Sequence, residues 1–138
     1  MNRVFTIMLV VFFSSNVFAD KDKDKYILQN LNEDFIACGS YWNVMSLGAQ
    51  RANDQKKAEQ FLNVSSKYFK EAFEIAKLIG MSEQAVKSAA KLHIKDIGSD
   101  MSNDFSNVSI IIEKYGRFCK NLLENPDQRI EYWEKNIR

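Results

Sequence analysis

The chain has 138 residues, of which 46% are hydrophobic and 27% charged, with 19 basic against 18 acidic side chains. This length suits one domain with a modest core. The near-neutral charge does not indicate a nucleic-acid partner or charge-driven binding to a membrane, because both normally select a basic excess.

Residues 1–19 have the features of a secretory signal peptide. Arg3 gives a positive start, an apolar run extends from Val4 to Phe13, and a small residue, Ala19, closes the segment. The run is about half the length that spans a bilayer. We expect cleavage before Asp20, a periplasmic or secreted location, and no stable membrane insertion afterwards. The alternative is a retained N-terminal anchor. Loss of Arg3 would leave 18 basic and 18 acidic residues.

The sequence contains two cysteines, Cys38 and Cys119, which are 81 positions apart. In an oxidising compartment such a pair forms a disulfide if the geometry allows. A loop of that length is worth roughly 4 to 5 kcal/mol of stability in the chain-entropy model. A nucleophilic or redox thiol is the alternative, but the chain has no Cys-x-x-Cys motif and only His93 to activate a thiolate. We therefore predict a structural disulfide.

Residues 20–25 alternate aspartate and lysine, which predicts a solvated, flexible leader before a single helical domain at 26–138. From Leu28 to Ala52, apolar residues recur at spacings of three and four, which predicts a long helix. Gly39 and Gly48 weaken this helix and mark either a kink or the close approach of a neighbouring helix. The predicted buried stripe is Leu28, Leu31, Phe35, Cys38, Trp42, Met45, Ala49 and Ala52.

The same spacing predicts further helices at about 54–79, 82–97, 108–123 and 126–138. Gly80 suits a left-handed helix end, and Ser82 suits an N-cap. Asn107 is a candidate cap for the fourth helix, and Asn125 with Pro126 marks the start of the last. The predicted apolar faces of these helices include Leu62, Leu92, Ile112, Leu123 and Ile137.

These elements predict an all-α fold, a four- or five-helix bundle after a cleaved signal peptide. Cys38 and Cys119 both fall on predicted inner stripes of separate helices. That placement suits one disulfide between two helices.

Catalytic and cofactor motifs are poorly represented in the sequence. It has no His-Glu-x-x-His, phosphate-binding glycine loop or Gly-x-Ser-x-Gly motif, and a single histidine gives little basis for a metal site. His93 is interpreted as a helix-face residue rather than a catalytic base. We expect no enzyme activity, no cofactor and no bound metal.

Four aromatic residues are candidates for contact with a partner. Tyr41 and Trp42 are adjacent on a helix, so only one of them can point fully inward. Phe73 lies off the main stripe of its helix, and Trp133 lies on the last helix. Aromatic side chains at the edge of a bundle either complete its core or anchor another protein.

The layout of the chain is similar to that of small exported immunity proteins that neutralise cell-wall amidase effectors. The similarity rests on the signal peptide, an early Cys38, a late Cys119 and the tail that follows it to Trp133. It implies a non-catalytic inhibitor that binds another protein outside the cytoplasm. The alternatives are a periplasmic chaperone-like stress protein, a helical pocket protein for a small apolar ligand and, last, an enzyme with carboxylate chemistry. A homodimer is also open.

Overall fold

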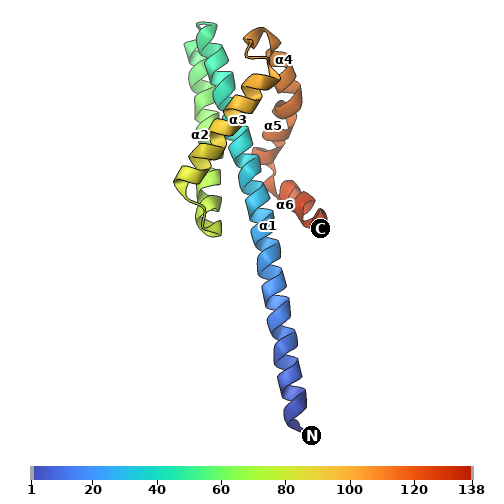
Figure 1. Ribbon diagram of the computed structural model, residues 1–138. Coiled ribbons are helices and arrows are strands. Elements are labelled where there is room, and N and C mark those ends of the chain that lie inside the picture. Colours follow the sequence, from blue (N-terminus) through green and yellow to red (C-terminus); the bar gives the residue numbers. More distant parts are fainter. Residues whose placement is uncertain (1, 138) are drawn as a thin grey trace.

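The protein is all-α, with five helices packed together (Figure 1). A disulfide between Cys38 and Cys119 links two of them. The computed structural model describes the backbone of residues 2–137 and the side chains of residues 20–137. The helices are α1 (Asn2–Arg51), α2 (Gln55–Ile79), α3 (Glu83–Asp100), α4 (Val108–Ile111), α5 (Arg117–Glu124) and α6 (Pro126–Lys135). A 3₁₀ turn, η1 (Phe105–Asn107), precedes α4, and a π-helical segment, η2 (Ile112–Gly116), joins α4 to α5 as one helix.

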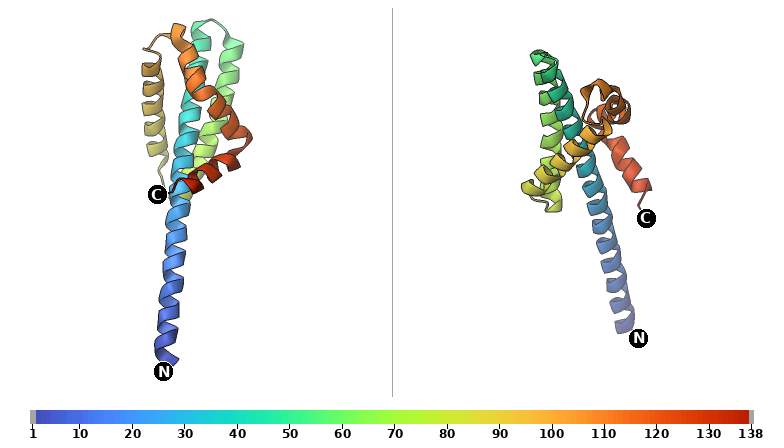
Figure 2. Two further views of the ribbon diagram at one scale, coloured as in Figure 1. Left: turned by 90° about the vertical axis from the view of Figure 1, so that its right-hand side faces the viewer. Right: turned by 45° about the horizontal axis from the view of Figure 1, so that its top comes forward.

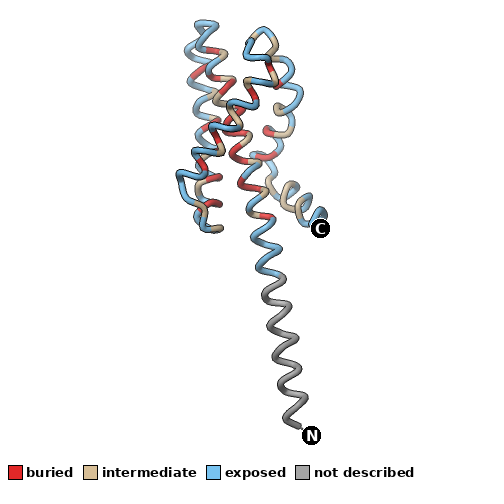
Figure 3. Tube along the Cα trace, viewed as in Figure 1, coloured by how far each residue is buried: buried red, intermediate tan, exposed pale blue. Residues whose placement is uncertain are grey.

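Helix α1 is the central element of the fold. It forms an antiparallel hairpin with α2, α3 crosses it obliquely, and α6 turns back to contact it (Figures 1 and 2). Buried positions gather along α1 between Ile27 and Ala49 and along the helices around it (Figure 3). The fully buried side chains include Ile36, Cys38, Tyr68, Val86, Ile97, Ile111, Cys119 and Leu122.

Because α1 is covered on several sides, it buries more than the predicted stripe. Ile36, Tyr41 and Val44 lie between the predicted positions and are also buried. Small polar side chains then fit between helices: Ser40 donates to the carbonyl of Ala90 in α3, at 3.3 Å. From α2, Ser65 donates to the carbonyl of Gly39, at 2.7 Å. These hydrogen bonds satisfy hydroxyl groups that the close contact between helices removes from water.

The predicted ends of α2 and the start of α3 are confirmed. Asp54 caps α2, its Oδ1 accepting from the Lys57 backbone N–H at 3.0 Å. Gly80 has a φ of 73°, in the left-handed region that favours glycine, and ends α2. The Ser82 hydroxyl oxygen accepts from the Ala85 N–H at 3.1 Å, as expected of an N-cap.

The predicted position of Asn107 as the N-cap of the fourth helix is confirmed, but its side chain does not act as a cap. Asn107 occupies the cap position, but its side chain makes no capping hydrogen bond there. It donates instead to the carbonyl of Met101, at 3.1 Å. Asp104 caps the preceding 3₁₀ turn, its Oδ1 accepting from the Ser106 N–H at 2.9 Å. Two local side-chain hydrogen bonds thus reinforce the backbone hydrogen bonds of the connection between α3 and α4.

Several residues that were predicted to lie on apolar stripes are exposed, which corrects their assignment. Leu92 is 63% exposed on α3 and Ile112 is 44% exposed at the start of η2. The π-helical hydrogen bonds of η2 link residues i and i+5, so they shift the residues after η2, including Leu123, from the α-helical register. The exposed stripe members are Ala52, Leu62, Leu92, Ile112, Leu123 and Ile137.

Gly39 and Gly48 mark close approaches rather than kinks. A Cβ built on Gly39 would lie 3.0 Å from the ring of Phe69, and one on Gly48 would lie 2.7 Å from the ring of Phe105. Neighbouring helical segments therefore place an aromatic ring directly against the α1 backbone at each glycine.

We expect Gly48→Ala to destabilise the protein by about 1 to 3 kcal/mol, although alanine favours a helix, because the new methyl group overlaps the Phe105 ring. Chemical denaturation measures the change. Gly116→Ala is the matched control, since its Cβ would lie 3.4 Å from the Tyr41 hydroxyl, an ordinary contact. Equal effects of the two substitutions would contradict the steric explanation.

The disulfide joins α1 to α5 with a Cα–Cα distance of 5.3 Å, which confirms the predicted pairing. Both cysteines are fully buried. The Tyr68 hydroxyl of α2 donates to the backbone carbonyl of Cys119, so α1, α2 and α5 meet at this point. Burial raises the pKa of Tyr68, with a smaller opposing effect from Trp42. The phenol therefore stays protonated as a donor.

The predicted signal peptide, residues 1–19, lies outside the residues whose side chains the structure describes, and it stays a prediction. Residues 20–25 continue helix α1 and all their side chains are exposed. No helix in the described part of the chain is long and apolar enough to cross a bilayer. The disulfide is consistent with an oxidising, extracytoplasmic compartment.

Candidate functional site

The structure places Tyr41 in the core and Trp42 at its edge. Tyr41 is 2% exposed and stacks on Tyr115, with 5.8 Å between the ring centroids. Trp42 is half-buried and packs against Phe61, with 5.3 Å between the ring centroids. In this fold Tyr41 offers no surface to a partner, which corrects its selection as a contact residue. The inward member of the pair is the tyrosine.

Trp133 is half-buried in a cluster that holds α6 against α1. Its indole Nε1 donates to Asp34 Oδ2 at 2.7 Å. Arg129 donates to both carboxylate oxygens of Asp34, at 2.6 and 3.0 Å. The Arg129 guanidinium also lies 4.2 Å from the centroid of the Tyr132 ring and 4.9 Å from that of Phe118. We call Asp34, Arg129, Tyr132 and Trp133 the α1–α6 lock.

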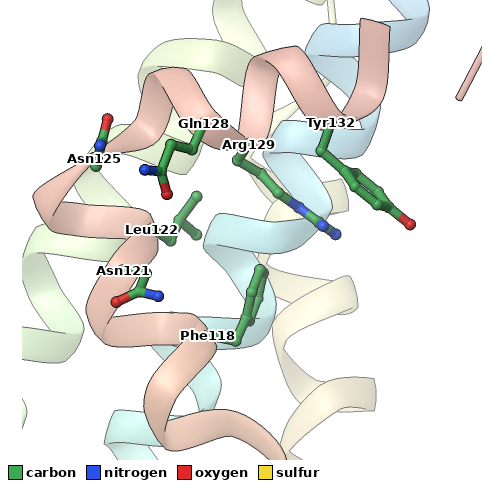
Figure 4. A pocket seen from close by; sticks show the side chains of 7 residues that line it. All are labelled: Phe118, Asn121, Leu122, Asn125, Gln128, Arg129 and Tyr132. Carbon is green, nitrogen blue, oxygen red and sulfur yellow. The ribbon is translucent and has the colours of Figure 1, made fainter. Parts of the chain in front are cut away.

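A pocket of about 180 Å³ lies beside this lock, between α5 and α6 (Figure 4). Figure 4 shows the Arg129 side chain extending between Phe118 and Tyr132. The pocket is smaller than the roughly 300 to 1,000 Å³ typical of ligand sites, and its cation is already paired with Asp34. The lock therefore serves the fold, and this pocket is a weak candidate for a ligand.

Phe73 lies in a larger depression between α2 and α3, which we call the α2–α3 groove. Its volume is about 380 Å³. Phe69 and Phe73 are one helical turn apart on α2, and Val86, Ala90 and Ile94 repeat at the same spacing on α3. Both walls are thus apolar ridges. The remaining lining residues are Gln84, Lys87 and Lys91.

The charged side chains that line the α2–α3 groove are both cations. Lys87 and Lys91 are four residues apart on α3, so they lie on the same side of that helix. Lys87 contacts Glu83 at 3.8 Å in an exposed i,i+4 pair, which is worth little at a surface. No carboxylate from residues 20–137 lies within ion-pair distance of Lys91. The groove therefore presents an apolar floor with a positive edge.

Two other polar clusters connect helices at the surface. His93 Nε2 lies 3.0 Å from Glu33 Oε2, so its partner comes from α1 rather than from nearby sequence. Lys114 of η2 donates to Asp100 Oδ2 at 2.8 Å, and Tyr115 donates to the same oxygen at 3.2 Å. The Lys114 hydrogen bond lowers the pKa of Asp100, and the same bond raises the pKa of Lys114. These contacts fix the π-helical segment to the end of α3.

Within residues 20–137, no three histidine, cysteine, aspartate or glutamate side chains come together in a way that could hold a metal ion. The chain matches no protein-family model, no curated protein and no solved structure. The candidate site is therefore argued from this chain's own residues.

Of the four aromatic candidates, Phe73 is the one that lines the α2–α3 groove. Sequence reasoning missed its neighbours Phe69, Lys87, Lys91 and Ile94. Phe69 contacts the core while lining the groove, so it combines both roles. The lysines gave no local signal, since surface lysines on helices are common. Only the packing of α2 beside α3 brings the lysines next to Phe69 and Phe73, and the sequence does not show that packing.

Proposed function

We propose that this chain is an exported, non-catalytic protein that binds another protein as an inhibitor or immunity-type partner, and that the α2–α3 groove is its docking face. The observation that carries the proposal is the groove itself. Phe69 and Phe73 supply aromatic contact area beside the small side chain of Ala90. Aromatic anchors in a shallow apolar site are typical of the energetic centre of a protein interface.

The shape and charge of the groove favour a helical segment as the partner element. Two antiparallel or oblique helices with apolar ridges leave a channel that accepts the apolar face of a third helix. Lys87 and Lys91 would contact acidic residues on the flank of that helix. We therefore expect an amphipathic, acidic helix of another extracytoplasmic protein.

Site-specific crosslinking tests this proposal. The exported protein, purified with its disulfide intact, carries a photoreactive residue in place of Gln84, which lines the groove. The control carries it in place of Lys135, an exposed residue of α6. We expect one dominant partner to crosslink at position 84 and not at position 135, with the crosslinked peptide acidic and helical.

Charge reversal provides an independent measurement. Lys87→Glu with Lys91→Glu should weaken binding of the crosslinked partner by at least tenfold, because two like charges would face its acidic flank. Lys120→Glu with Lys135→Glu changes the net charge equally at a distance from the groove and should leave binding within twofold. Unchanged binding after the first double substitution would contradict the proposed face. Crosslinks to many unrelated proteins would favour the chaperone alternative.

A further inference from the structure

A second pocket, which we call the hairpin-end pocket, lies where the α1–α2 hairpin meets the connection between α3 and α4. Its volume is about 480 Å³, which falls within the range typical of small-molecule sites. Figure 1 shows these two segments at the same end of the molecule. The uncharged lining residues are Met45, Gly48, Ala49, Ala52, Phe61, Phe105 and Val108.

The wall of the hairpin-end pocket is apolar because of small residues on α1 and larger ones opposite. Gly48 lets the Phe105 ring approach the α1 backbone, where a Cβ would lie only 2.7 Å from the ring. Met45 and Val108 are partly buried against the core and continue the apolar surface inward. The pocket therefore offers hydrocarbon contact along its depth.

The charged lining residues of this pocket are two cations from different helices. Arg51 comes from the last turn of α1 and Lys57 from the first turns of α2. The Arg51 guanidinium carbon lies over the Phe105 ring, 4.6 Å from its centroid, in a cation–π contact. The nearby Asp54 is engaged as the α2 cap, where it accepts from the Lys57 N–H at 3.0 Å.

We infer that the hairpin-end pocket binds a free long-chain carboxylate, with its alkyl chain on Met45, Phe61 and Val108 and its carboxylate between Arg51 and Lys57. A planar guanidinium matches the two oxygens of a carboxylate, and the lysine adds a second positive charge. The charged residues of the α2–α3 groove are two lysines from one helix, and the groove has no arginine. The arginine, held in a cation–π contact with Phe105, thus distinguishes the hairpin-end pocket. This site is independent of the proposed protein partner.

Calorimetric titration of the oxidised, exported protein with sodium dodecanoate, kept below its micelle concentration, tests the inference. We expect one saturable site. Trp42 fluorescence should change with the same midpoint as the calorimetric titration, because the Trp42 ring centroid lies 5.3 Å from that of the pocket residue Phe61. Trp133→Phe removes the other tryptophan and isolates that signal. Arg51→Gln with Lys57→Gln should weaken dodecanoate binding at least tenfold, with helical content and melting temperature measured on the same samples.

Three matched measurements give the outcomes that would overturn the site. Lys87→Gln with Lys91→Gln should leave the affinity within twofold. If it weakens binding more than the Arg51 and Lys57 changes do, the ligand lies in the α2–α3 groove. Dodecyltrimethylammonium should bind at least tenfold more weakly, and equal binding would exclude recognition of the carboxylate. Binding to anionic phospholipid vesicles without saturable binding of monomeric dodecanoate would indicate a membrane surface as the target. If the folded protein binds no dodecanoate at all, the inference is also refuted.

Discussion

Replacing Cys38 and Cys119 together by alanine should lower the free energy of unfolding by roughly 4 to 5 kcal/mol. The disulfide closes a loop of 81 residues, and removing it restores the conformational freedom of that loop in the unfolded chain. For a small domain this is a large share of the total stability, which is typically about 5 to 15 kcal/mol. Urea denaturation of the oxidised and the doubly substituted protein measures the difference.

Reduction of the unsubstituted protein provides the control, because it breaks the same bond without changing side-chain volume. The oxidised protein should show no alkylatable thiol in its native state, since both sulfurs are buried and bonded to each other. Reduction and double substitution should then lower the melting temperature by similar amounts. Two reactive thiols in the native, unreduced protein, or an unchanged melting temperature on reduction, would contradict the predicted role.

Periodicity and helix-end chemistry were sufficient to predict which segments are helical. Gly80 and Ser82 define the turn between α2 and α3 through local backbone and hydroxyl chemistry, so a short window of sequence contains the signal. The disulfide followed from two cysteines on apolar stripes and an expected oxidising compartment. The helix ends depend on neighbours within one or two helical turns, and the disulfide pairing needed no choice because the chain has two cysteines.

The central position of α1 was harder to predict, because a helix covered on several sides loses its simple stripe. Ile36 and Val44 lie outside the predicted stripe and are buried, whereas Ala52 inside it is exposed. The π-helical segment η2 likewise has no clear sequence signal. Ile112 is exposed at its start, while Tyr115 stacks on Tyr41 and donates to Asp100. Such details depend on contacts between distant segments.

The α2–α3 groove and the α1–α6 lock could not be predicted for the same reason, because each joins residues that are distant in sequence. Phe73 was selected because it departs from the stripe of its own helix, which is a local observation. Lys91 joins it only because α3 lies beside α2, and Asp34 meets Arg129 across 95 positions of sequence. A single charged residue on a helix is usually solvated, so no rule applied to one segment would have chosen these partners.

Asp34→Ala should release α6 from α1 and cost about 2 to 3 kcal/mol, because the carboxylate accepts three hydrogen bonds, two of them from a cation. The side chains of Asp34 and Arg129 are only 12% and 23% exposed, so water replaces the lost bonds poorly. The substitution would leave the Arg129 guanidinium among the Tyr132 and Trp133 rings without its counter-charge. Since α6 is the last helix, we expect its local unfolding to increase before the disulfide-bonded part unfolds.

Hydrogen exchange resolved by segment measures this effect, with faster exchange expected in α6 and little change in α2 and α3. Trp133 emission should also shift towards that of a solvated indole. Glu131→Ala is the matched control, because its pair with Lys135 lies on the same helix with side chains 65% and 77% exposed. If Asp34→Ala and Glu131→Ala affect α6 exchange equally, the lock does not hold this helix. If instead the whole domain exchanges faster after Asp34→Ala, α6 belongs to the same cooperative unit as the disulfide-bonded helices.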